Sequence, residues 1–160
     1  MDSVELKSKI AGGETLILEF KGERRGPLND RDLVEAVICL ANADGGLLLV
    51  GVEDNGEVTG ARPRHGGYTD VARLQALVRS RTVPGLEVAV EPVSLPEGGV
   101  LCLTVPRSAA VVATSDGVCL RRTLGAHGPE CVPYYPHPSA EPAGSRGKTG
   151  KAGYQALVLL

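Results

Sequence analysis

The sequence has very few aromatic residues and no long hydrophobic run. Of its 160 residues only 3% are aromatic, with no tryptophan and a single phenylalanine. Leu, Val, Ile and Ala must therefore build the core, and few side chains are available for stacking on nucleobases. No apolar run approaches the roughly 20 residues of a membrane-spanning helix, and no signal peptide pattern opens the sequence. We expect a cytoplasmic protein that makes no membrane contact.

Length and charge limit the organisation of the chain. A domain of this size can bury a sizeable core, and we expect one domain over residues 1–137. Residues 138–160 are rich in Pro, Gly, Ala and Ser, which predicts a disordered low-complexity tail. The net charge is −2 and the tail is basic, so the body is the more acidic part. This balance excludes a broadly basic nucleic-acid-binding surface and leaves only local patches for phosphate contacts.

Paired cysteine motifs are also absent. The four cysteines form no CxxC pair, and three of them, Cys39, Cys102 and Cys119, lie within apolar periodic segments, while Cys131 does not. This placement favours reduced, buried thiols over a disulfide or a zinc site.

Hydrophobic periodicity predicts a mixed β-sheet of about six strands. Residues 16–21 alternate between apolar and polar, as in a half-buried strand. Residues 47–52 are almost wholly apolar, which is typical of a central strand. The pair Asn55-Gly56 then predicts a tight hairpin in which both turn residues adopt positive φ. Further strands are expected over 86–93, 99–105 and 111–121.

Two main helices are expected between these strands. Asn29 can cap the first helix, with the acidic Asp32 three residues on, and the pair Gly45-Gly46 tolerates the positive φ needed where that helix stops. Thr69 or Asp70 opens the second helix, and Pro84 and Gly85 end it. The predicted class is α+β.

Three carboxylates are candidates for a metal site. Glu14 and Glu19 are five residues apart, so in an unbroken strand they would point to opposite faces. Glu19 shares a face with Lys21, and the simplest interpretation of that pair is a solvated strand face with a weak ion pair. Asp54 follows the central strand, where it can hydrogen-bond the turn backbone. Alternatively, the three acids together could hold Mg²⁺ or Mn²⁺ and activate water.

Arginines cluster in short pairs that could contact phosphates. They are exceptions to the acidic balance of the body. With one lysine, the candidate nucleic-acid-binding residues are Lys21, Arg24, Arg25, Arg62, Arg64, Arg121 and Arg122.

Residues 14–60 resemble the AlbA-like DNA-binding domain of the Schlafen family. The resemblance lies in three motifs in order: E-x4-EFK, LANADGG at the end of a helix, and LLLVGVEDNGEVTG. It implies a single AlbA-like lobe with an α+β fold that associates with nucleic acid, often in bacterial transcriptional regulators. Schlafen ribonucleases use a three-carboxylate metal site, and Glu14, Glu19 and Asp54 match it by motif. Those enzymes join two lobes into a horseshoe, so a comparable groove here would need a homodimer.

Three functions follow as hypotheses. The favoured one is a non-enzymatic module that binds DNA or RNA, for which the sequence indicates no cofactor. The second is a nuclease dependent on Mg²⁺ or Mn²⁺, with catalytic residues Glu14, Glu19 and Asp54. The third is a protein-interaction lobe that keeps only a vestigial site.

Overall fold

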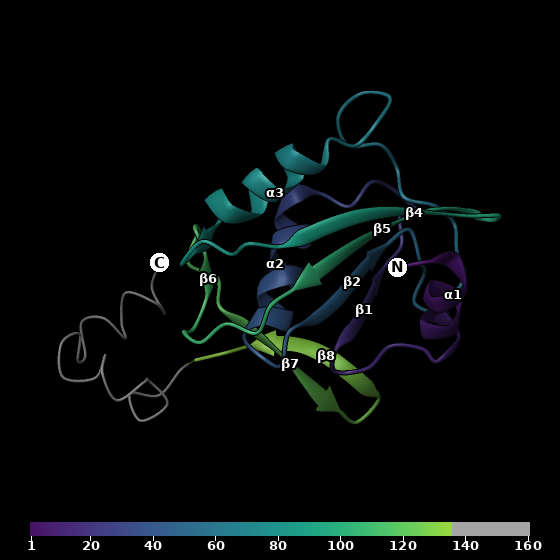
Figure 1. Ribbon diagram of the computed structural model, residues 1–160. Helices are drawn as coiled ribbons and strands as arrows, with labels where there is room; N and C mark the ends of the chain where they lie inside the picture. Colours follow the sequence, from purple (N-terminus) through teal and green to yellow (C-terminus); the bar gives the residue numbers. More distant parts are fainter. Residues whose placement is uncertain (136–160) are drawn as a thin grey trace, which may run out of the picture.

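The computed structural model describes residues 1–135, which form helices and strands around one mixed sheet (Figure 1). The predicted boundary at residue 137 and the predicted tail 138–160 lie outside the described residues. The helices are α1 (Ser3–Ala11), α2 (Asp30–Ala41) and α3 (Val71–Ser80). The strands are β1 (Leu18–Lys21), β2 (Gly46–Val50), β3 (Thr82–Val83), β4 (Ala89–Leu95), β5 (Gly98–Val105), β6 (Ala113–Thr114), β7 (Leu120–Gly125) and β8 (Gly128–Pro133).

The central sheet has four strands in the order β1-β2-β5-β4. β1 and β2 are parallel, and α2 connects them, whereas β5 is antiparallel to both of its neighbours. Leu48 and Leu49 are adjacent in β2 and both fully buried, as expected for a strand covered on both faces. The α+β class with a mixed sheet is therefore confirmed, and β1 is an edge strand.

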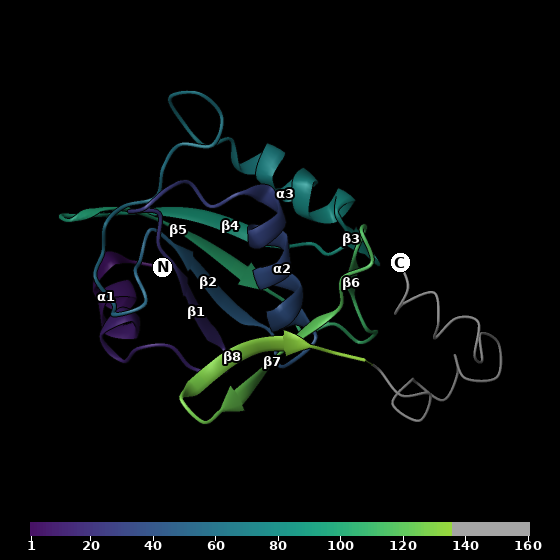
Figure 2. The ribbon, with the colours of Figure 1, turned by 180° about the vertical axis from the view of Figure 1, so that it is seen from behind.

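Helices cover both faces of this sheet. α2 and α3 pack against one face, where Leu48 and Leu103 belong to the larger core cluster (Figures 1 and 2). α1 covers the opposite face through Leu6 and Ile10, which pack in a second cluster with Phe20. Two further pairs of strands, β3 with β6 and β7 with β8, stand apart from the sheet. Within residues 1–135 no helix is long and apolar enough to cross a membrane.

Helix starts follow local sequence signals. The Asn29 side chain accepts a 2.7 Å hydrogen bond from the Asp32 backbone N–H at the start of α2, as predicted. Gly45 has φ +74°, which lets the chain leave α2 for β2. Asp70 caps α3 in the same way, through the backbone N–H of Arg73.

Three local features differ from the sequence-based expectations. α1 was not predicted, although Asp2 caps it and Leu6 and Ile10 bury one face. β8 was not predicted as a separate strand. The hairpin after β2 does turn back, through a bridge between Val52 and Val58, but only Gly56 has positive φ, at +87°. The turn is longer than two residues, as the hydrogen bond from the Glu53 N–H to the carbonyl of Glu57 shows.

The expectation of four reduced cysteines was wrong for two of them. Cys39 of α2 and Cys131 of β8 form a disulfide, with their Cα atoms 6.0 Å apart. Cys102 and Cys119 are free and buried, as expected. The error has a physical origin, because 92 residues separate the bonded pair and only the packing of β8 against α2 brings them together.

Candidate nucleic-acid interface

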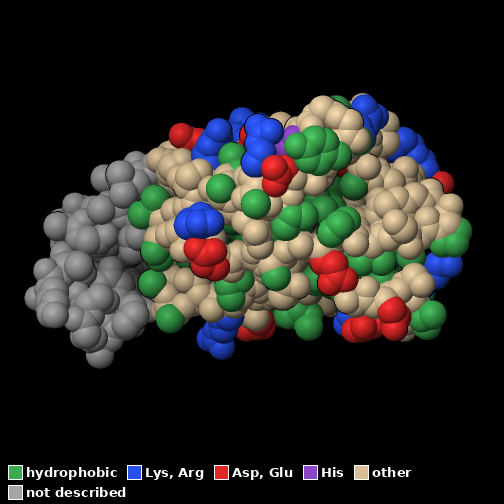
Figure 3. All heavy atoms as spheres, turned by 45° about the horizontal axis from the view of Figure 1, so that its top comes forward, with side chains coloured by type: hydrophobic (Ala, Val, Ile, Leu, Met, Phe, Trp, Pro, Cys, Tyr) green, Lys and Arg blue, Asp and Glu red, His purple; other side chains and the backbone are tan. Residues whose placement is uncertain are grey.

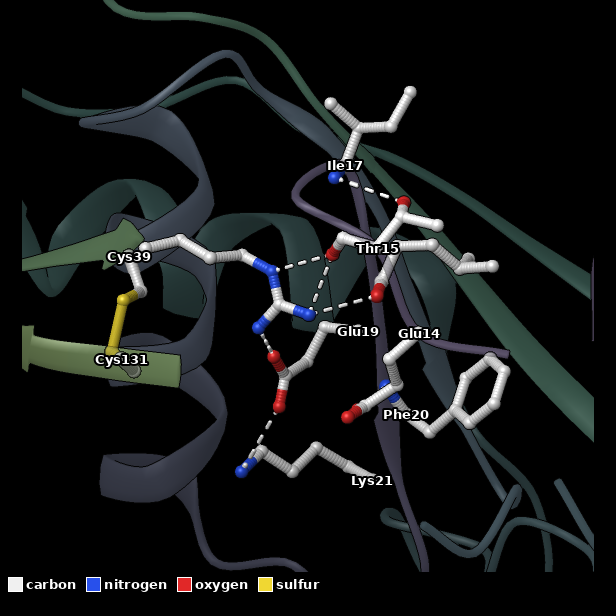
Figure 4. A network of polar contacts seen from close by, with 10 residues as sticks. Glu14, Thr15, Ile17, Glu19, Phe20, Lys21, Cys39 and Cys131 are labelled. Atoms are coloured by element: carbon white, nitrogen blue, oxygen red, sulfur yellow. Dashed lines mark hydrogen bonds and ion pairs between the residues drawn. A yellow bond between two sulfur atoms is a disulfide. The ribbon is translucent and has the colours of Figure 1, made fainter. Parts of the chain in front are cut away.

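The edge of β1 is closed by side chains instead of a further strand. The Glu14 carboxylate accepts a 2.7 Å hydrogen bond from the backbone N–H of Phe20. The guanidinium of Arg122, from β7, donates to the carbonyls of Thr15 and Leu18 at 2.8–2.9 Å (Figure 4). Exposed strand edges pair readily with other strands, and these contacts occupy groups that such pairing would use. Glu14 and Arg122 therefore have structural roles at this edge.

Arg122 is also the centre of an ion-pair network. It pairs with the Glu19 carboxylate, whose other oxygen lies 3.4 Å from the Lys21 ammonium (Figure 4). The side chain of Glu19 is only 13% exposed. Its predicted solvated face is thus covered by β7.

The buried position of Arg122 affects its ionisation. Burial lowers the pKa of the guanidinium, and the negative charge of Glu14 acts in the opposite direction. An arginine still remains protonated at neutral pH. Glu19 is therefore paired with a cation that the protein itself supplies, and the charge of Glu14 favours the same cation.

The three predicted metal ligands do not form one site. Asp54 is exposed in the turn after β2, whereas Glu14 and Glu19 contact the β1 backbone and Arg122. In the part of the chain that the structure describes, no group of three His, Cys, Asp or Glu side chains could hold a metal ion. The spacing of acids along the sequence could not reveal this, because the competing cation, Arg122, is 103 residues from Glu19.

A cluster of arginines lies at the carboxyl ends of β1 and β2. Buried Glu23 accepts 2.7 Å hydrogen bonds from the backbone N–H groups of Leu28 and Arg62. Arg62 donates in turn to the carbonyls of Glu23 and Arg24. These bonds join the loop after β1 to the segment after β2, so that Arg24, Arg25 and Arg62 form one group, which we call the loop patch. Glu23 was not identified from the sequence as the residue that joins these two segments.

The loop-patch arginines differ in whether an acidic side chain or a backbone carbonyl already engages the guanidinium. Arg24 is paired with Glu57. Arg25 is exposed and forms no ion pair within residues 1–135. Arg62 is exposed, although its guanidinium also bonds to backbone carbonyls. In the space-filling view, acidic side chains lie among the basic ones of the upper rim, in keeping with the slightly negative net charge (Figure 3).

The remaining predicted phosphate contacts are placed in other ways. The Arg64 side chain is only 9% exposed and bonds to the Leu28 carbonyl and the Asp30 carboxylate. It holds the loop before α2. Arg121 lies on β7, away from the loop patch, with its guanidinium carbon 5.4 Å from the centre of the Tyr134 ring. Arg122, as described above, is buried.

Asn42 is a positioning residue that sequence reasoning missed. It caps the end of α2, and its amide exchanges two 2.8 Å hydrogen bonds with the backbone of Val112. A third bond goes to the carbonyl of Leu120, at the start of β7. The amide thus joins three segments, and its place in the motif LANADGG is the one signal that could have identified it.

Seven chains of solved structures are similar to this protein, among them the following two. The DIP2311 protein from Corynebacterium diphtheriae matches with a TM-score of 0.58 and 23% identity, covering 82% of this chain and 26% of that one. The N-terminal domain of an "ATP-dependent DNA helicase RecG-related protein" from Nitrosomonas europaea matches with a TM-score of 0.46 and 23% identity. That match covers 68% of this chain and 74% of that one. The chain thus spans about a quarter of the DIP2311 protein, and the likeness to it shows a shared fold.

Sequence comparison is more specific. No curated protein matches this chain. The family model described as Schlafen, AlbA_2 matches residues 14–127, which include the closed β1 edge, the loop patch and β7. Because this match covers well over half of the chain, the protein belongs to the Schlafen AlbA_2 family.

Proposed function

We propose that this domain binds nucleic acid, DNA or RNA, through phosphate contacts made by the loop patch. The observation that carries the proposal is the gathering of Arg24, Arg25 and Arg62 from two segments that are 38 residues apart in the sequence. Membership of the AlbA_2 family supports it, because the resemblance in sequence implies nucleic-acid association. Arg25 contributes the freest of these charges.

The chemistry of the patch suits a backbone contact. Arginine presents several N–H donors to phosphate oxygens and releases counterions when it binds them. Such contacts fix the position of the nucleic acid but carry no sequence information. We therefore propose binding with little sequence preference. A role within a transcriptional regulator is compatible with that mode.

The geometry gives no comparable support to a metal-dependent nuclease. That function would need Glu14, Glu19 and Asp54 to share a cation, and the first two are engaged by Phe20 and Arg122.

Homodimerisation stays a prediction. Sedimentation of the protein alone and with nucleic acid tests it, since a groove built from two lobes requires two copies on one molecule.

Fluorescence anisotropy with labelled DNA and RNA oligonucleotides tests the proposed function. Binding is expected at low salt, and log K should fall linearly with log salt concentration. Absence of binding at low salt, or an affinity that does not respond to salt, would leave the protein-interaction hypothesis in its place.

A further inference from the structure

A groove runs past the carboxyl end of α2, away from the loop patch. It consists of two hollows, of about 400 Å³ and about 160 Å³, which share the lining residues Ala43, Arg121 and Tyr134. The β7–β8 hairpin forms one wall, and the segment 107–111 forms the other. We call it the hairpin groove. The larger hollow falls within the range of about 300–1,000 Å³ that is usual for small-ligand sites.

The walls of this groove are held by backbone hydrogen bonds. Asn42 fixes the segment around Val112 and the start of β7, as described above. The backbone N–H of Tyr134 donates to the Cys119 carbonyl at 2.9 Å, which anchors the residue whose ring faces the groove. The neighbouring Cys131 is tied to α2 by the disulfide. A ligand would therefore meet a preformed surface.

A stacked pair of side chains lies where the two hollows meet. The Arg121 guanidinium carbon is 5.4 Å from the centre of the Tyr134 ring, within the range of a cation–π contact. Tyrosine and arginine are also the side chains on which unpaired nucleobases stack. Tyr135, the next residue, is 72% exposed. The chain has few aromatic residues, and two of them, Tyr134 and Tyr135, are adjacent at this groove.

The charges around the groove favour an anionic ligand. Arg107 and Arg121 are exposed and form no ion pair within the described residues. The buried Arg122 is neutralised by Glu19. One acid, Asp44, lines the larger hollow. A carboxylate there would repel a phosphate but can accept a hydrogen bond from the amino group of a base.

We infer that the hairpin groove binds a single-stranded segment of nucleic acid, with an unpaired base stacked on Tyr134 and Arg121 and a phosphate bound by Arg107. The inference rests on the proposed function and adds a ligand class to it. A base within a duplex is stacked between its neighbours, so it cannot enter a side-chain platform of this kind without being unstacked. Single strands are therefore bound at two places, the loop patch and the hairpin groove, and duplexes at the loop patch.

The test uses the full chain and an oligonucleotide that contains 2-aminopurine, whose fluorescence falls when the base stacks. The variants are Tyr134→Leu, which removes the ring, and Tyr134→Phe, which keeps it. Arg79→Gln is the matched control, because Arg79 lies on α3 and pairs with Glu87. Thermal unfolding confirms that each variant is folded, and duplex of the same sequence is measured in parallel.

Wild type and Tyr134→Phe should quench the fluorescence. Tyr134→Leu should not, and its affinity for the single strand should fall about 5- to 150-fold, the cost of losing one stacked base. Its affinity for duplex should change less than about twofold, because the loop patch is intact. Equal quenching and equal affinity in wild type and Tyr134→Leu would contradict base stacking in the hairpin groove and leave the proposed function standing. If wild type binds neither single strand nor duplex, the proposed function itself fails.

Discussion

Buried Arg122 on β7 and partly buried Glu19 on β1 form an ion pair that joins the hairpin to the edge of the central sheet. The same guanidinium occupies the carbonyls of Thr15 and Leu18. One side chain thus fixes the position of β7 and closes the strand edge. It also accounts for an acid that the motif alone would assign to a metal site.

Replacing Arg122 with methionine should destabilise the domain by about 3 kcal/mol. The change leaves the Glu19 carboxylate without its buried partner. It also removes the guanidinium donors to the Thr15 and Leu18 carbonyls, each of which keeps one backbone donor. Urea unfolding measures the difference. The neighbouring Arg121→Met serves as the control and should cost less than about 1 kcal/mol, since that side chain is exposed. Equal losses in the two variants would show that the buried network has no special part in stability.

Glu14 should behave as a backbone cap. Glu14→Ala removes the acceptor of the Phe20 N–H and should cost about 1–2 kcal/mol. Glu14→Gln keeps a side-chain oxygen at that position and should retain part of this stability. Hydrogen exchange of the Phe20 amide gives a local readout, because it should speed up in the alanine variant and less in the glutamine one. Unchanged exchange in Glu14→Ala would contradict the assignment.

Reduction of the disulfide should lower the free energy of unfolding. Cys39 and Cys131 enclose a loop of 92 residues, and the chain-entropy relation gives a loss of about 4–5 kcal/mol for a loop of this length. Urea unfolding with and without a reducing agent measures it. The Cys131→Ser variant should be about as unstable as the reduced protein and insensitive to reductant. If wild type unfolds at the same urea concentration in both conditions, the pair does not restrain the fold.

The two free thiols should be unreactive in the native protein. Burial raises the pKa of Cys102 and Cys119 from 9.0 to about 11. Because the raised folded pKa favours the neutral thiol, their contribution to stability is complete below pH 9 and is lost as the pH rises through about 11. Iodoacetamide at pH 8 should label neither thiol until urea unfolds the chain, as mass spectrometry can show. Rapid labelling of the folded protein would contradict this burial.

Local elements were predictable from the sequence, and long-range contacts were not. The Asn29 cap and the fully apolar β2 each depend on a few neighbouring residues, so both could be predicted from a short stretch of sequence. The disulfide and the pairing of Arg122 with Glu19 depend on how β7 and β8 pack, which no local pattern encodes.

The same difference applies to the candidate sites. The arginine pairs were recognisable in the sequence, but the two members of a pair can differ in solvent exposure. Arg121 is exposed beside Tyr134, whereas Arg122 next to it is enclosed. Alternation along β7 places successive side chains on opposite faces, and the sequence did not show which face α2 would cover.

The role of the loop patch is tested by the salt dependence of nucleic-acid binding in Arg25→Gln compared with wild type. Loss of one arginine–phosphate contact should reduce the slope of log K against log salt by about 1 on duplex DNA. Arg79→Gln, which removes an equal charge from α3, should leave the slope unchanged. Identical slopes for wild type and Arg25→Gln would contradict the assignment of phosphate binding to the loop patch.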